Sequence, residues 1–204
     1  MDLEDEALVD RYRQTGDASF FKSLVRRYQN RIYNSAYRML GNKEEAEEVV
    51  QDTFVKVHNG LSGFRRQASF AAWLFRISHN LCIDNLRSRK RQRGLLFFFP
   101  SSSNADGDGD RPAPELRDDG PDPQQIVDLS EQSSVVAGAL AKLPESQRAV
   151  LVLHDMEGFS YQDIASIVGT SIGTVRSRLH YGRLKMRELL EPYFSPEGET
   201  ARSR

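Results

Sequence analysis

Apolar side chains recur every three or four positions through most of this 204-residue chain, the spacing that places them along one side of an α-helix. The pattern is clearest in Phe20–Leu40, Ala46–Val57 and Phe70–Leu81. No segment shows the apolar–polar alternation of a strand buried on one face. The sequence therefore predicts an all-α protein built from several amphipathic helices.

Residues typical of helix ends divide the first half of the pattern. Gly16, Gly41 and Gly60 follow apolar stretches, and glycine is the commonest residue just beyond the last turn of a helix. Asn42 and Ser69 precede the next stretches, and their side chains are good N-caps. We expect helices that end at these glycines and begin at these caps.

The middle of the chain lacks this pattern. Residues 94–128 are rich in Pro, Gly, Ser and Asp and contain 2 basic and 8 acidic side chains. Without periodic apolar residues, such a segment has no core to offset the entropy of ordering. We therefore predict two small helical domains, 1–93 and 129–194, joined by a flexible acidic linker, 94–128, with a frayed tail, 195–204.

The charge is unevenly distributed. Residues 1–93 hold 17 basic and 12 acidic side chains, whereas residues 129–204 hold 9 of each. The formal total of −1 thus combines a basic block, an acidic linker and a balanced block. A basic block of this kind indicates a polyanionic partner such as nucleic acid.

Composition excludes several other classes. The single cysteine, Cys82, rules out an intramolecular disulfide and fits a reducing cytoplasm. The acidic start is unlike a secretory signal, and the longest apolar run is far shorter than the roughly 18 residues of a membrane span. His79 and Cys82 lie three positions apart, but two ligands are too few for structural zinc, so we expect packing and no metal.

A helix-turn-helix is the strongest local signal. Ser160 and Asp163 form a capping pair, Gly169 permits a tight turn, and Val175 is placed to pack the second helix on the first. The second helix then displays a polar, basic face: Thr174, Arg176, Ser177, His180, Arg183 and Lys185. Such a helix fits the DNA major groove; the alternative is a plain helical hairpin with a solvated face.

A second signal lies in the stretch that begins at Ser69. One polar side of the predicted helix can carry Trp73, Arg76, Asn80 and Arg87. An aromatic ring with Arg and Asn can stack on an unpaired base and bond its edge, while nearby cations hold phosphates. The alternatives are that Trp73 packs in the core and that the basic run to Arg93 is a solvated helix end.

The ordered set of motifs resembles the extracytoplasmic-function (ECF) group of bacterial RNA polymerase sigma factors. The matching stretches are Glu47–Val57, Phe64–Asn80, Asp84–Arg87, Leu143–Arg148, Gly158–Ala165 and Gly173–Leu179. The resemblance implies domains called sigma-2 and sigma-4, which bind core RNA polymerase and promoter DNA. It implies a cytoplasmic location and control by a cognate anti-sigma factor. It implies no catalytic residue, no cofactor and no membrane insertion.

The resemblance also assigns residues. It implies that the β′ clamp helices of the polymerase are contacted by Glu48, Gln51, Asp52 and Val55. The second domain would contact the β flap. For capture and melting of the promoter −10 element it implies Phe64, Arg65, Ser69, Phe70, Trp73, Arg76, Asn80 and Arg87. For reading the −35 element it implies Ser171, Thr174, Arg176, Ser177, His180, Arg183 and Lys185.

Two other functions are compatible with a DNA-reading helix. A repressor or activator would bind a duplex operator without polymerase, usually as a dimer. A recombinase or nuclease would need an activated nucleophile or a carboxylate cluster, and no compact constellation of that kind is evident in the sequence. The acidic linker adds a hypothesis: its carboxylates could occupy a basic channel of the polymerase built for nucleic acid.

Overall fold

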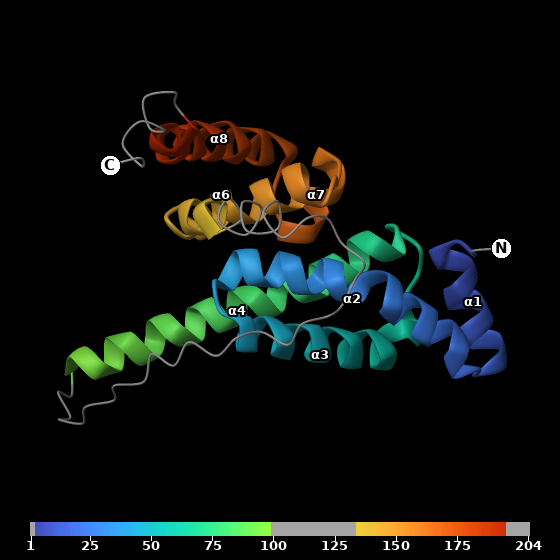
Figure 1. The fold of residues 1–204 in the computed structure, drawn as a ribbon. Coiled ribbons are helices and arrows are strands. Elements are labelled where there is room, and N and C mark those ends of the chain that lie inside the picture. Colours follow the sequence, from blue (N-terminus) through green and yellow to red (C-terminus); the bar gives the residue numbers. More distant parts are fainter. Residues whose placement is uncertain (1–2, 99–133, 195–204) are drawn as a thin grey trace, which may run out of the picture.

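The computed structural model describes residues 3–98 and 134–194, and every regular element within these two stretches is helical (Figure 1). The first stretch contains α1 (Asp5–Thr15), α2 (Ala18–Leu40), α3 (Lys43–Gly60), the 3-10 turn η1 (Leu61–Gly63) and α4 (Phe70–Phe98). The second contains a helix over residues 134–141, α6 (Glu145–Leu151), the π-helical turn η2 (Val152–Met156), α7 (Tyr161–Val168) and α8 (Ile172–Phe194). The predicted all-α class is confirmed.

Local signals set the helix ends as the sequence predicts. Gly16 and Gly41 both close their helices in the left-handed conformation, with φ of 69°. The Asn42 side chain accepts a hydrogen bond from the Glu45 amide at 2.8 Å. The Ser69 hydroxyl accepts one from the Ala72 amide at 3.2 Å. These side chains satisfy amides that a helix start otherwise leaves without partners.

The helix-turn-helix is present between α7 and α8. The Ser160 hydroxyl accepts from the Asp163 amide at 3.1 Å, and Gly169 forms the turn with φ of 67°. Val175 is fully buried between the two helices. The capping pair, the glycine and the valine therefore have the structural roles that the sequence indicates.

One boundary differs from expectation. Helix α4 continues to Phe98, past the predicted domain end at residue 93. The added residues, 94–98, include Leu95 and Leu96, and leucine is a good helix former. The rest of the predicted linker, from residue 99, and the predicted tail, 195–204, lie outside the described residues.

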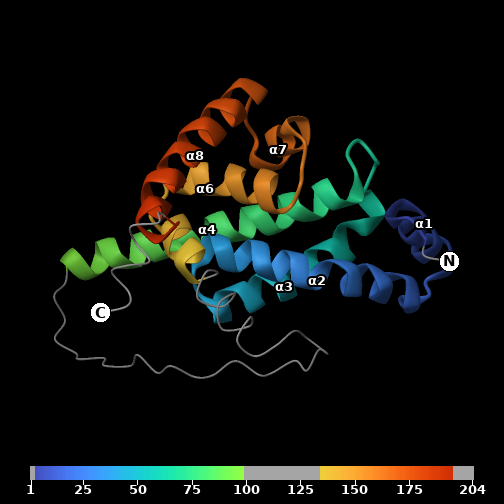
Figure 2. The same cartoon turned by 45° about the horizontal axis from the view of Figure 1, so that its top comes forward.

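The two helical halves pack directly on each other. Figures 1 and 2 show α6 and α7 beside α2 and α4, with α8 packed on the far side of α6 and α7. One hydrophobic core contains buried residues of both halves. Within it, Phe75 of the first half and Phe159 of the second meet edge to face, with ring centroids 4.9 Å apart. The predicted linker therefore connects two modules that already share a core.

Polar contacts reinforce this junction. The Arg148 side chain is buried, and its Nη1 donates to the Met39 carbonyl at 2.5 Å. Arg31 donates to the Glu157 carboxylate at 3.1 Å. Burial raises the pKa of Glu157, and the charge of Arg31 partly offsets that effect. The Glu157 carboxylate and the Arg148 guanidinium are both removed from water, and burial of a charged group is costly unless it has such partners.

Across residues 3–98 and 134–194, no helix combines the length and the apolar character that a bilayer span requires.

Candidate polymerase and nucleic-acid interface

A polar stripe runs along the outer face of α3. Its residues are Glu48, Gln51, Asp52 and Val55, all exposed. Their spacing of three, one and three positions places them on one face, while Val49, Thr53 and Val57 point into the core. Val55 is 59% exposed, which leaves an apolar side chain in solvent at one end of a stripe that also carries Glu48 and Asp52. The structure thus groups all four residues predicted to contact polymerase.

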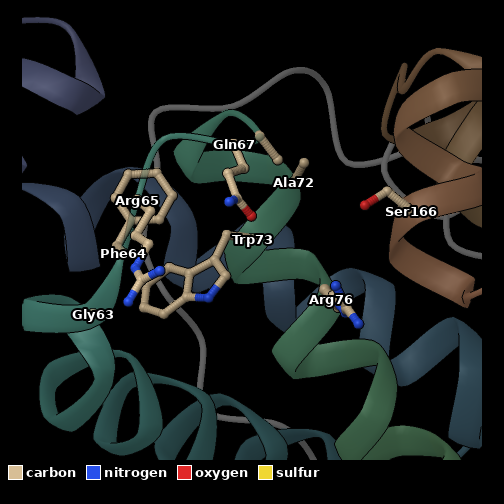
Figure 3. Close-up of a pocket in the computed structure, with 9 residues that line it drawn as sticks. Gly63, Phe64, Arg65, Gln67, Ala72, Trp73, Arg76 and Ser166 are labelled. Carbon is tan, nitrogen blue, oxygen red and sulfur yellow. The ribbon is translucent and has the colours of Figure 1, made fainter.

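A pocket opens where η1 leads into α4 (Figure 3). Its volume is about 220 Å³, below the roughly 300–1,000 Å³ of sites for drug-sized ligands. Trp73 lies at its centre, with Arg65 and Arg76 at its edges. The remaining lining residues are Gly63, Phe64, Gln67, Ala68, Ala72 and Ser166. Ser166 belongs to α7, so the second half of the chain closes one side of the pocket.

Aromatic packing fixes the position of Trp73. Its ring centroid lies 5.1 Å from that of Phe64 and 6.0 Å from that of Phe70. Gly60 lies beneath the indole, where an added Cβ would approach to 3.4 Å. Trp73 is half-buried, whereas Phe64 is only 6% exposed and Phe70 is fully buried. Trp73 therefore packs on the core and also lines the pocket, and the two phenylalanines support it from the core.

Four residues predicted for the −10 element do not line the pocket: the buried Phe70, and Ser69, Asn80 and Arg87. Ser69 is the N-cap of α4. Asn80 and Arg87 are exposed on α4, about 10 Å and 21 Å along the axis from Trp73 at 1.5 Å per residue. Arg87 lies 3.6 Å from Asp84, both largely in solvent. Asn80 and Arg87 extend a polar track that leads away from the pocket.

Helix α8 presents the predicted basic face. Arg176, Ser177, His180 and Lys185 are exposed, and the Arg176 guanidinium lies 5.8 Å from the centre of the Tyr161 ring. A hollow of about 520 Å³ adjoins this face; its lining adds Leu179, Leu184 and Arg187. The sequence interpretation missed Tyr161 and Arg187, although Arg187 continues the basic pattern of the helix.

Some predicted readers have partners within the protein. The Thr174 amide donates to the Ser171 hydroxyl at 3.2 Å, so Ser171 caps α8. Arg183 donates to the Asp155 carboxylate through Nε at 3.0 Å. This hydrogen bond raises the pKa of Arg183. These contacts fix the start of α8 and the Arg183 side chain in position within the module.

His79 and Cys82 lie at the junction of the two halves. They line a cavity of about 10 Å³ together with Ala149 and Val152. Burial, with a smaller effect of the Arg178 charge, lowers the pKa of His79 to about 4. Burial raises the pKa of the Cys82 thiol to about 12. In the part of the chain that the structure describes, no three His, Cys, Asp or Glu side chains are grouped as metal ligands.

These features define a two-module DNA-binding class, with an aromatic–arginine pocket in one half and a basic helix-turn-helix in the other. Residues 24–92 match the family model Sigma-70 region 2, and residues 134–186 match Sigma-70, region 4. The chain belongs to the extracytoplasmic-function (ECF) group of bacterial sigma factors. The resemblance indicated by the sequence motifs is therefore confirmed.

Relatives cover most of the chain. It is 38% identical over 191 residues to the ECF RNA polymerase sigma factor SigE of Mycolicibacterium smegmatis, with 92% of this chain and 69% of that protein covered. It is 33% identical over 175 residues to SigW of Bacillus subtilis, with 86% and 91% covered.

Solved structures show the same fold. The sigma factor RpoE of Bartonella quintana, in complex with the anti-sigma factor NepR, matches with a TM-score of 0.62 and 27% identity over 84% of this chain and 96% of that chain. CnrH, in complex with the cytosolic domain of CnrY, matches with a TM-score of 0.63 and 25% identity over 92% and 97%.

Proposed function

We propose that this chain binds core RNA polymerase in the bacterial cytoplasm and directs it to promoters, acting by binding and without chemistry of its own. The observation that carries the proposal is that both Sigma-70 regions lie in one chain, in order. Each region presents exposed polar or cationic side chains for a partner. The proposal divides into three contacts.

The pocket at Trp73 captures the −10 element as single strand. Flipping a base out of a duplex costs a few kcal/mol, and stacking it on an aromatic ring returns about 1–3 kcal/mol. Arg65 and Arg76 lie at the pocket edge, where they can meet the base edge or the adjoining phosphates. Binding energy therefore accounts for strand opening without a source such as ATP.

The module formed by α7 and α8 reads the −35 element as duplex. The N-terminal part of a recognition helix contacts base edges in the major groove, and Arg176 and Ser177 are exposed there. His180 and Lys185 follow on exposed positions and are placed for phosphates. Base contacts confer sequence preference, whereas phosphate contacts confer affinity.

The α3 stripe is the proposed contact with the β′ clamp helices, and the second module would contact the β flap. Asp52 and Glu48 supply acceptors for a basic helical surface, and Val55 supplies an apolar contact. One relative in structure, RpoE, is bound to an anti-sigma factor. We infer that this chain also has a cognate anti-sigma factor.

In vitro transcription with core polymerase and a promoter library tests the proposal. We expect the full chain to bind core and to select transcripts that share −35 and −10 sequences. Asp52→Arg should abolish selection through loss of core binding, whereas Lys56→Ala, at another exposed position of α3, should leave it intact. Unaltered start-site choice would contradict the proposal.

The same protein tests the alternative functions. A repressor or activator would bind a duplex operator tightly without core, and a nuclease or recombinase would nick supercoiled DNA in Mg²⁺. Either result would replace the sigma interpretation.

A further inference from the structure

Helix α1 lies outside the matched Sigma-70 region 2, which begins at residue 24, yet it contacts the segment that forms the Trp73 pocket. Figure 2 shows α1 beside the start of α4. The segment Gly63–Ser69, here called the pocket loop, connects η1 to α4. Four side chains of α1 or the loop join the two: Glu6, Asp10, Arg13 and Arg66.

Arg13 holds the entrance of the pocket loop. Its Nε donates to the Leu61 carbonyl at 2.9 Å, and its Nη2 donates to the Phe64 carbonyl at 2.7 Å. A guanidinium presents its donors in a rigid planar fork, so the two bonds set the direction in which the chain leaves η1. Phe64, whose carbonyl is bound, also carries the ring that supports Trp73.

Arg66 holds the middle of the loop. It has φ of 53° and is the one non-glycine residue with positive φ in the stretches that the structure describes. This conformation is unfavourable for a residue with a Cβ and persists only where surrounding contacts impose it. The Arg66 guanidinium forms an ion pair with Asp10 and donates to the Glu6 carbonyl at 3.2 Å.

Glu6 holds the exit of the loop. Its carboxylate accepts a hydrogen bond from the Phe70 amide at 3.1 Å. The first amides of a helix have no internal partner, and a carboxylate at a helix N-terminus is favourable. Glu6 therefore fixes the start of α4, from which Trp73 and Arg76 project one and two turns later.

We propose that α1 is a positioning element that holds the pocket loop in the shape that accepts a −10 base. Entrance, middle and exit are bound to one rigid helix, and most lining residues of the pocket lie between these anchors. The Arg66–Asp10 pair is about half exposed, and such pairs add little to global stability. The contacts between α1 and the pocket loop therefore affect the shape of the loop, and hence which base the pocket accepts. This inference rests on the proposed function of the pocket.

The test measures base discrimination by holoenzyme, made from core polymerase and the full chain. The probes are promoter fragments with a pre-melted −10 region that carry each of the four bases at the captured position, and the readout is the ratio of their affinities. Arg13→Ala and Asp10→Ala should each reduce that ratio about tenfold. Arg11→Ala is the matched control, since Arg11 is an exposed cation on the same helix, and it should retain the ratio.

Further measurements separate positioning from folding. The melting temperature, the core affinity and the −35 dependence should stay near their original values in Arg13→Ala and Asp10→Ala. The double variant Asp10→Arg with Arg66→Asp restores an ion pair of opposite direction and should recover discrimination that each single change loses.

The outcomes are distinct. A selective original protein whose Arg13→Ala and Asp10→Ala variants are equally selective would overturn the role of α1. Parallel losses of melting temperature, core affinity and discrimination would also overturn it, since they would mark α1 as a structural support. No discrimination by the original protein would instead overturn the function proposed for the pocket.

Discussion

Trp73 and its neighbours show how burial divides a set of residues that the sequence treats as equal. Phe64, Phe70 and Trp73 all stand in one motif, but only Trp73 combines partial exposure with a place at the centre of the pocket. An exposed aromatic face is what stacking on a base requires. The two phenylalanines contribute by fixing the plane of the indole.

Replacement of Trp73 separates its two roles. Trp73→Ala should lower the free energy of unfolding by about 2 kcal/mol, less than the roughly 3–5 kcal/mol of a fully buried aromatic. It should also reduce transcription from a duplex promoter. Trp73→Phe should retain most of both properties, because a ring remains. Urea denaturation and transcription assays on the same variants check this prediction. If Trp73→Ala were destabilised but transcribed as well as the original protein, Trp73 would have a role in the core alone.

Arg176 and Lys185 carry the same charge on α8 but have different surroundings. Lys185 lies 2.7 Å from the Glu188 carboxylate, whereas Arg176 lies over Tyr161 near the helix start. Arg176→Ala should relax preference in the −35 element by about 1–3 kcal/mol. Lys185→Ala should weaken binding to all sequences alike and reduce its salt dependence. Holoenzyme affinity for −35 variants at two salt concentrations measures both; loss of core binding in Arg176→Ala would contradict this assignment.

At the scale of the elements, the turn between α7 and α8 depends on one backbone conformation. Gly169 has φ of 67° and open space around its Cα. Gly173 lies in the first turn of α8, with the Ser171 hydroxyl 3.8 Å from an added Cβ. The two glycines therefore differ in backbone conformation while both have room for a methyl group.

Alanine at these glycines should have opposite effects. Gly169→Ala forces a Cβ into the left-handed region and should lower stability by about 1–2 kcal/mol. Gly173→Ala should be neutral or stabilising by up to about 1 kcal/mol, because alanine is the better helix former. Thermal melting of both variants measures the difference; equal effects would show that backbone conformation at Gly169 is not what limits the turn.

At the scale of the whole molecule, the shared core requires the two modules to be in contact, whereas the proposed DNA contacts require them to be far apart. Ser166 of α7 closes one side of the Trp73 pocket, so the two modules touch at the candidate −10 site. Elements near −35 and −10 are about 25 base pairs apart, or roughly 85 Å along B-form DNA at 3.4 Å per pair. Both modules can reach their elements only after they separate.

Fluorescence transfer between the modules measures this separation. Dyes on Lys56→Cys and Glu191→Cys, both at exposed positions, should show high transfer in the free protein and a large decrease in the promoter complex with core. Cys82 is buried and should label slowly. Unchanged transfer in an active promoter complex would contradict separation of the modules.

Acid should weaken the docked form through His79. Its pKa in the folded protein is about 4, below the usual 6.5 of the unfolded chain, so the folded state binds fewer protons. The stability is complete above pH 6.5 and is lost as the pH falls toward 4; between pH 7 and pH 5 the loss is about 2 kcal/mol. Cys82 stays neutral in this range, because burial raises the pKa of its thiol to about 12.

Urea denaturation at pH 7 and pH 5 tests this dependence. His79→Gln should flatten the pH profile, because glutamine does not titrate. An equal pH dependence in the variant would assign the effect to other groups.

The sequence by itself determined the helical class, the caps at Asn42 and Ser160, the turn at Gly169 and the exposed faces of α3 and α8. These features depend on side chains within four positions of one another, and such spacing is visible in a linear chain. Only the tertiary structure decided that Phe70 is buried, that Arg13 binds carbonyls 48 and 51 residues away, and that Arg31 meets Glu157 across 126 residues. Those contacts depend on how helices pack and on which polar groups lose water together, and local periodicity contains neither piece of information.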